Sequence, residues 1–211
     1  METNGICSIC KAEVTQKGRS AHLKSCIKKH YSNEGGVNRY FLLSISGRYA
    51  PCYWLNIIFD QDWGLSVLDG FLRDVWVECC GHMSEFKIDG VSYSSYSDTE
   101  SDDEDMDIEI SRVVRVKDKF LYLYDFGSTT ELVIKVIDSF QSNKQIKEPE
   151  IIARNNPPEI GCDECDAPAT QICSNCQIWL CDKCSKRHRG GEDMMLPAVN
   201  SPRVGVCAYA G

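Results

Sequence analysis

The residues best suited to chemistry in this sequence are cysteines, which recur in pairs separated by two residues. The chain has 13 cysteines among 211 residues, and four such pairs lie near its two ends. The pairs are Cys7/Cys10, Cys162/Cys165, Cys173/Cys176 and Cys181/Cys184. This spacing is typical of zinc ligands, because a tight turn places both sulfurs on one ion. Disulfide frameworks seldom repeat it, so the pairs predict metal sites.

The first pair is followed by a histidine and a cysteine that a helix would bring together. His22 and Cys26 form an i, i+4 pair, and residues at this spacing share one face of a helix. With Cys7 and Cys10 they give the ligand order Cys-Cys-His-Cys of a zinc finger, one residue shorter between its pairs than the usual C2H2 pattern. His30 is an alternative fourth ligand, but Cys26 is favoured because His30 lies two turns beyond His22.

The C-terminal cluster supplies eight candidate ligands, enough for two zinc ions. Only four residues separate Cys176 from Cys181, so filling the sites in chain order would crowd the two metals. Interleaved sites avoid this crowding and resemble the cross-brace of B-box zinc domains, although those usually end in histidine. The predicted sets are Cys162, Cys165, Cys181 and Cys184 for one ion, and Cys173, Cys176, His188 and Cys207 for the other. With the N-terminal finger, they predict three zinc ions per chain.

Catalytic motifs are not evident in the sequence. Each predicted zinc set is complete with four protein ligands, which is typical of structural zinc; only without Cys207 would the second C-terminal site have the open position of a catalytic one. Residues 125–127 spell Asp-Phe-Gly, but the accompanying kinase motifs do not occur, so they predict a hairpin turn. Cys79 and Cys80 are interpreted as buried structural thiols. We therefore expect no enzymatic activity, since catalysis by Cys80, His82 and Asp125 would require these residues to converge in space.

Charge is distributed unevenly along the chain. The first 30 residues carry six basic and two acidic side chains, whereas the whole chain has a net charge of −8. The predicted finger helix would expose Arg19, Lys24, Lys28 and Lys29, a surface that is either simply solvated or in contact with nucleic acid. Because an acidic protein repels nucleic acid at long range, any such contact is expected to be local to the finger.

The region between the clusters has the pattern of an α+β domain. Residues 40–46 and 53–59 are rich in aromatic and β-branched side chains and predict strands. Apolar residues then recur at helical spacing at Leu65, Leu68, Phe71, Leu72, Val75 and Trp76. Residues 120–124 and 132–137 are apolar on both faces and predict interior strands. The expected fold is an antiparallel sheet with one main packed helix, flanked by two small zinc-binding modules.

Glycine-rich and proline-rich segments near residues 35 and 157 divide the chain into three parts. The predicted parts are a zinc finger at 1–34, an α+β domain at 38–155 and a cross-brace zinc module at 159–211. Inside the α+β domain, residues 92–109 end in a run with eight acidic side chains. Such a run buries little apolar surface, so it is expected to form a mobile acidic loop.

Two segments of the central part carry a recognisable pattern, GFLRDVWVECCGHMSEFKIDG at residues 70–90 and KFLYLYDFGSTTELVIKV at residues 119–136. A helix followed by His-x2-Glu-Phe, and the later Tyr-Asp-Phe-Gly, make this region resemble the plasmid pRi ORF-three-like family. The resemblance covers roughly residues 38–155. It implies a small α+β domain of undetermined activity, found alone or fused to zinc modules, and it implies no chemistry.

These features together predict a zinc-binding, non-enzymatic interaction protein. Its partner is expected to be nucleic acid, bound through the basic finger, or a protein, bound through the C-terminal module as a scaffold; no small-molecule substrate is indicated. No apolar run approaches the roughly 20 residues that a membrane-spanning helix needs. The N-terminus also lacks the pattern of a signal peptide, so a cytoplasmic location with reduced cysteines is expected.

Overall fold

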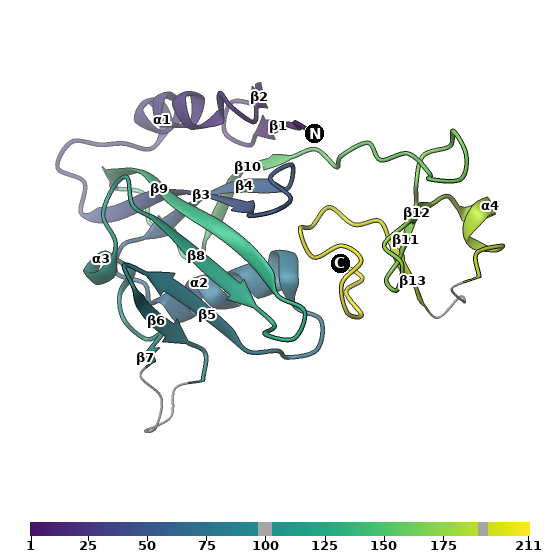
Figure 1. Ribbon diagram of the computed structural model, residues 1–211. Coiled ribbons are helices and arrows are strands. Elements are labelled where there is room, and N and C mark those ends of the chain that lie inside the picture. The colour runs from purple at the N-terminus through teal and green to yellow at the C-terminus, as the bar shows by residue number, and fades with distance from the viewer. Residues whose placement is uncertain (97–102, 190–193) are drawn as a thin grey trace.

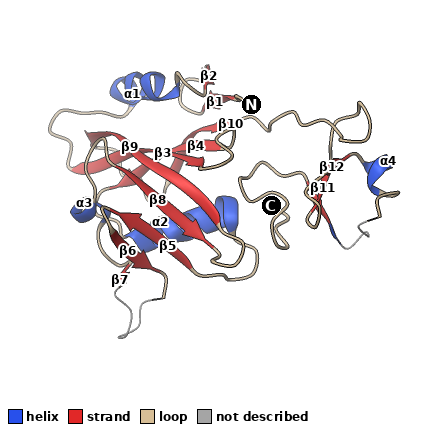
Figure 2. Cartoon of the chain, in the orientation of Figure 1, coloured by secondary structure: helices blue, strands red, loops and turns tan. Residues whose placement is uncertain are grey.

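The computed structural model describes residues 1–96, 103–189 and 194–211. Most of the chain forms one large sheet with helices on both sides, and a smaller sheet lies near the C-terminus (Figure 1). Strands outnumber helices, and a long loop connects the two sheets (Figure 2). This is an α+β arrangement, as the sequence predicts.

The strands of the large sheet are β1 (Asn4–Cys7), β2 (Glu13–Thr15), β3 (Asn38–Gly47), β4 (Trp54–Asp60), β5 (Ser84–Ile88), β6 (Val91–Ser94), β7 (Glu104–Asp105), β8 (Lys119–Tyr124), β9 (Thr130–Ser142) and β10 (Glu150–Asn155). The small sheet contains β11 (Gln171–Cys173), β12 (Trp179–Leu180) and β13 (Met195–Pro197). The helices are α1 (Arg19–His30), α2 (Leu65–Leu72), α3 (Ile110–Val113) and α4 (Asp182–Ser185), with a π-helical turn η1 (Arg73–Val77) after α2. Within the described residues, no helix is both long enough and apolar enough to cross a membrane.

The large sheet is mixed rather than wholly antiparallel. Its strand order is β2-β1-β10-β4-β3-β9-β8-β5-β6-β7, and each adjacent pair is antiparallel except β6 and β7. A parallel pair needs a connection that returns to the starting end of the first strand. Nine residues separate β6 from β7, more than a tight antiparallel hairpin uses. The prediction of an antiparallel sheet is therefore wrong at this edge and correct elsewhere.

Both faces of the central strands are apolar, and each face is covered by a different helix. On β3, Leu43 and Ile45 belong to the core beneath α2, whereas Tyr40 and Leu42 belong to a second core beneath α1. The two helices lie on opposite sides of the sheet (Figure 1). The sequence predicts one main packed helix, which is α2. It does not predict that α1 packs on the sheet, because its spacing places this helix in a separate zinc finger.

The predicted secondary structure of the central region is confirmed. Residues 40–46 and 53–59 lie in β3 and β4, and residues 120–124 and 132–137 lie in β8 and β9. The helical stripe forms α2 and continues into η1, where the side chain of Trp76 is fully buried. A hairpin turn joins β8 to β9, as the Asp-Phe-Gly segment predicts.

The N-terminal segment is built into the large sheet. Strand β1 pairs with β10, and Gly5 lies opposite Asn155. A Cβ atom at Gly5 would lie 2.6 Å from the ring of Trp54 and closer still to a backbone carbonyl, so only glycine fits at this crossing. Arg19, which was expected to face solvent, instead places its guanidinium 4.7 Å from the centre of the Trp54 ring. Burial lowers the pKa of Arg19 to about 10.

The C-terminal tail returns from the small sheet to the large one. The Ser201 hydroxyl donates a hydrogen bond to the carbonyl of Trp76 at 2.6 Å. Arg203 is fully buried, and its guanidinium contacts the Asp125 carboxylate at 2.7 Å and the Thr130 hydroxyl at 3.0 Å. A buried cation is tolerated only when it is paired in this way. The ion pair therefore fixes the position of the tail against the large sheet.

Part of the acidic segment is packed against the helix α2. The backbone N–H of Ser66 donates to the carbonyl of Met106 at 2.9 Å, and that of Leu65 donates to Ile108 at 3.1 Å. Met106 is buried beneath the sheet. The expectation of a mobile loop is therefore wrong for residues 103–109, because apolar residues between the acids fill the core. Residues 97–102 lie outside the described part of the chain.

We predict that Arg203→Met lowers the free energy of unfolding by about 3 kcal/mol, because it leaves the Asp125 carboxylate buried without its partner. Burial raises the pKa of Asp125, but hydrogen bonds from Arg203 and the turn backbone outweigh it and lower the pKa below its ordinary value. The ion pair therefore stabilises the fold above about pH 4, and this contribution is lost as the pH falls through the folded pKa.

Urea denaturation followed by circular dichroism, at pH 7 and below pH 4, measures this effect. Arg112→Met is the matched control, since Arg112 pairs with Glu109 on the surface, where such a pair contributes about 1 kcal/mol or less. Equal losses in the two variants would contradict the role given to the buried pair.

Candidate metal centres

Four groups of cysteine and histidine side chains converge among the described residues, and the ligand atoms within each group lie within 4.8 Å of one another. A tetrahedral zinc ion binds sulfur at about 2.3 Å and imidazole nitrogen at about 2.0 Å. Two sulfurs on one such ion are therefore about 3.8 Å apart, and a sulfur and a nitrogen about 3.5 Å apart. These separations test whether a group has the right size for a single ion.

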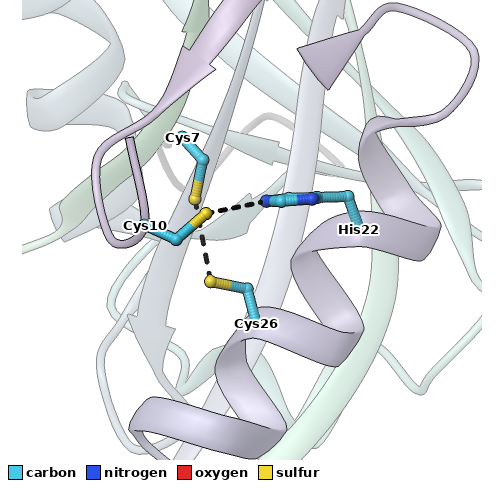
Figure 3. Close-up of side chains that lie close together, drawn as sticks. All are labelled: Cys7, Cys10, His22 and Cys26. Atoms are coloured by element: carbon cyan, nitrogen blue, oxygen red, sulfur yellow. Dashed lines mark hydrogen bonds between the residues drawn. The ribbon is translucent and has the colours of Figure 1, made fainter. Parts of the chain in front are cut away.

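The N-terminal group consists of Cys7, Cys10, His22 and Cys26, whose side chains point toward a common centre (Figure 3). The sulfurs of Cys7 and Cys26 are 3.8 Å apart, and the Cys10 sulfur lies 3.4 Å from Nε2 of His22. Both distances match the tetrahedral values. The group is able to hold one metal ion.

Two local structures position this group. After β1 the chain makes a tight turn, in which Lys11 adopts a φ of 63° and its N–H donates to the carbonyl of Cys7 at 2.9 Å. This turn carries the two cysteines of the first pair. The helix α1 supplies His22 and Cys26 from one face. His30, at the end of the helix, is exposed and lies outside the group.

The four-cysteine group consists of Cys162, Cys165, Cys181 and Cys184. The sulfur of Cys165 lies 3.7 Å from that of Cys181 and 3.8 Å from that of Cys184, again at tetrahedral spacing. The first pair lies in the loop before β11, and the second pair lies at the start of α4. Leu180 is fully buried among these cysteines.

The three-donor group consists of Cys173, Cys176 and His188. The Cys176 sulfur lies 3.4 Å from Nε2 of His188. A turn at Gln177, with a φ of 59° and an N–H···O bond to Cys173 of 2.8 Å, holds the cysteine pair. The three-donor and four-cysteine groups alternate along the chain, which is the interleaved arrangement that the spacing predicts.

Cys207 does not join the three-donor group, so its predicted grouping with Cys173, Cys176 and His188 is wrong. Its sulfur lies 3.8 Å from that of Cys80 and 3.6 Å from Nε2 of His82. The physical reason is the buried contact of Arg203 with Asp125, which ties the tail to the large sheet and away from the small one.

The interpretation of Cys79 and Cys80 as buried structural thiols is also wrong. Cys79 is half-buried and Cys80 is exposed, and both converge with His82 and Cys207 in a fourth group. The Cys-Cys-Gly-His motif was visible in the sequence, but its remaining partner is supplied by a segment far along the chain. No spacing rule connects positions so far apart.

The thiols in each group influence one another electrostatically. Burial, with hydrogen bonds to Cys181 and Cys165, raises the pKa of Cys184 to about 12. For Cys162, burial alone would raise the pKa, but backbone hydrogen bonds from Cys181 and Glu164 outweigh it and lower the pKa to about 7. Four thiols cannot all ionise beside one another without a compensating positive charge. A divalent metal supplies that charge, and it requires the deprotonated thiolates as ligands.

Fold and groups together define an α+β protein with Cys/His sets suited to metal binding. Residues 45–165 match the family described as plasmid pRiA4b ORF-3-like protein, which is more than half of the chain. The chain belongs to this family. The match begins inside β3, later than the expected start near residue 38, and ends at Cys165, beyond the expected end near residue 155.

The other comparisons add a similar structure but no activity. A crystal structure of a protein of unknown function from Methanosarcina mazei Go1 has 15% sequence identity and a TM-score of 0.49, covering 56% of this chain and 69% of that chain. No curated protein matches the sequence.

The interleaved grouping predicts how metal content responds to paired substitutions. Cys165→Ser and Cys181→Ser should each remove one zinc ion, and the double variant should lose no more than either single one, because both belong to the four-cysteine group. Cys165→Ser/Cys176→Ser should lose two ions. Metal per chain is measured by elemental mass spectrometry on untagged protein, with Cys52→Ser as the control outside all four groups of the described chain. Loss of two ions from Cys165→Ser/Cys181→Ser would instead indicate sites filled in chain order.

Proposed function

We propose that this chain is a zinc-binding, non-enzymatic interaction protein. The observation that carries the proposal is the tetrahedral spacing of the thiol-rich N-terminal and four-cysteine groups. Each contains four protein donors, the composition of structural zinc sites. Zinc bound there would stabilise small elements that bury little apolar surface and would leave no coordination position for a substrate.

The three-donor group is proposed to hold a third zinc ion. Three protein donors with an open position also occur in catalytic zinc sites, so this group, which has three donors among the described residues, is the one that an enzymatic alternative would use. The nearby cleft of about 550 Å³ is lined by residues such as Thr170, Ser185 and Leu196 and by none of the three donors. A structural role with water or a partner's side chain in the fourth position is therefore favoured.

Nucleic acid is the favoured partner because of the surface beside α1. Lys24, Lys28 and Lys29 are exposed on this helix, and the first two line a cleft of about 850 Å³ together with Arg39. Half-buried Phe140 lines the same cleft and offers a ring on which a base can stack.

The shape and charge of this cleft favour single-stranded nucleic acid over a duplex. One face of α1 is buried against the sheet, so the lysines border a hollow rather than projecting from a free helix that could enter a duplex groove. Glu34 and Asp138 also line the cleft, which moderates its positive charge. Binding is therefore expected to be weak and to depend on few phosphate contacts.

A second candidate function is protein scaffolding through the C-terminal module. Met195, Leu196 and Pro197 line the cleft beside β11, and Met194 is 42% exposed next to them. Apolar side chains gathered at an edge strand favour a protein partner. Such docking would depend much less on salt than phosphate binding does.

We predict that Lys24→Gln/Lys28→Gln weakens binding of single-stranded oligonucleotides about tenfold at low salt. Each lost phosphate contact should also reduce the slope of log K against log salt by about 0.7. Fluorescence anisotropy with labelled DNA and RNA over a range of salt concentrations measures both quantities. Lys117→Gln/Lys183→Gln is the charge-matched control, since both lysines are exposed and neither lines the cleft.

Equal weakening in the two variants would show that only overall charge matters and would remove α1 as the binding surface. Absence of oligonucleotide binding by the zinc-loaded wild type would contradict the nucleic-acid role and favour the scaffold.

A further inference from the structure

We propose that Cys79, Cys80, His82 and Cys207 form a fourth metal centre, which binds zinc and fastens the C-terminal tail to the large sheet. We call it the tail centre. Three thiols and one imidazole have ligand atoms within 4.8 Å of one another. The proposal goes beyond the structural zinc sites above, because it joins two distant parts of the fold.

The donor distances of the tail centre match those of the other groups. The sulfurs of Cys80 and Cys207 are 3.8 Å apart, close to the separation of two sulfurs on one tetrahedral zinc ion. Nε2 of His82 lies 3.6 Å from the Cys207 sulfur, close to the tetrahedral sulfur–nitrogen separation. The same spacing occurs in the N-terminal group, where the corresponding values are 3.8 Å and 3.4 Å.

The loop that carries three of the donors is held in place by its own hydrogen bonds. Glu78 directly follows η1 and accepts hydrogen bonds from the Gly81 N–H at 2.6 Å and the Tyr124 hydroxyl at 2.8 Å. Gly81 has a φ of 71°, which reverses the chain between Cys80 and His82. This reversal brings His82 back toward the two cysteines that precede it, and the ligand atoms of all three residues lie within 4.8 Å of one another and of Cys207.

The imidazole of His82 is oriented by groups outside the donor set. Its ring meets Tyr124 edge to face at 5.8 Å, and Nδ1 lies 3.7 Å from Oδ1 of Asp125. Metal-binding histidines are commonly oriented by a carboxylate near the second ring nitrogen, which leaves Nε2 free for the metal. Here Nε2 is the nitrogen that faces Cys207.

Arg203 contacts both a donor of the tail centre and the carboxylate that lies beside His82. The Arg203 guanidinium contacts the Asp125 carboxylate at 2.7 Å and lies 3.3 Å from the Cys79 sulfur. Because Arg203 also anchors the tail, the residue that positions Cys207 is in contact with a second donor of the centre.

A catalytic Cys207–His82–Asp125 arrangement is the competing interpretation of the same side chains. Two further observations favour metal. Cys79 and Cys80 add two more sulfurs around the imidazole, which a nucleophile does not need. Asp125 is already engaged by Arg203 and by the turn N–H groups of Gly127 and Ser128, so it is not free to act on His82 alone.

Metal content of Cys207→Ser in the untagged full-length chain tests the proposal, with Cys52→Ser as the matched control. Cys207→Ser should bind one zinc ion fewer than wild type, and Cys52→Ser should bind the same number. Loading with Co²⁺ should show a corresponding loss of sulfur-to-cobalt charge-transfer absorbance in Cys207→Ser only. Equal zinc content in wild type and Cys207→Ser would overturn the tail centre. A wild type without any zinc would instead overturn the proposed function as a whole.

A second measurement on the wild type avoids any folding defect of the variant. Cys80 and Cys207 are exposed, so free thiols at these positions should be alkylated rapidly by iodoacetamide. Bound metal should protect both until a chelator is added, as peptide mass spectrometry can show, whereas Cys52 should react equally with and without chelator. Rapid alkylation of Cys207 in the zinc-loaded protein, or a Cys80–Cys207 disulfide that persists in reducing buffer, would contradict a metal at this site.

Discussion

The constraint on which the rest of the structure depends is that the central strands are apolar on both faces. A sheet of this kind is stable only when each face is covered, because exposed apolar area weakens folding. The helix α2 covers one face and is contributed by the central region. The other face is covered by α1, so the N-terminal segment with its Cys/His group is a layer of the fold and packs on the sheet through Leu23 and Ile27. The candidate metal ligands and the core contacts therefore lie on the same helix.

Burial of Arg203 imposes a similar constraint at the other end of the chain. A guanidinium that loses its water must recover interactions inside the protein, and Asp125, Thr130 and a backbone carbonyl provide hydrogen bonds to its two terminal nitrogens. The β8–β9 hairpin supplies all three partners. This hairpin therefore does not only connect two strands. Its contacts with Arg203 also determine the position of the C-terminal tail.

The cysteine groups differ in the protection that the surrounding chain gives them. Three of the four sulfurs in the four-cysteine group are buried, whereas the fourth group has none that is fully buried. Solvent, oxidants and chelators reach exposed thiolates most easily. Among the described groups, the four-cysteine group is therefore the best protected from solvent, and the group at the tail is the most exposed.

From the sequence alone, local patterns were readable because they depend on neighbours along the chain. The Cys-x2-Cys pairs, the i, i+4 spacing of His22 and Cys26, and the apolar strands around the central helix all follow from backbone periodicity and turn geometry. The assignment of Cys207 failed because it depended on where a long segment returns. Only the tertiary structure decided this, since the burial of Arg203 against Asp125 is a contact between distant residues that no spacing encodes. The same reason applies to α1: its helical pattern was evident, but the sheet face that it covers was set by the pairing of β1 with β10.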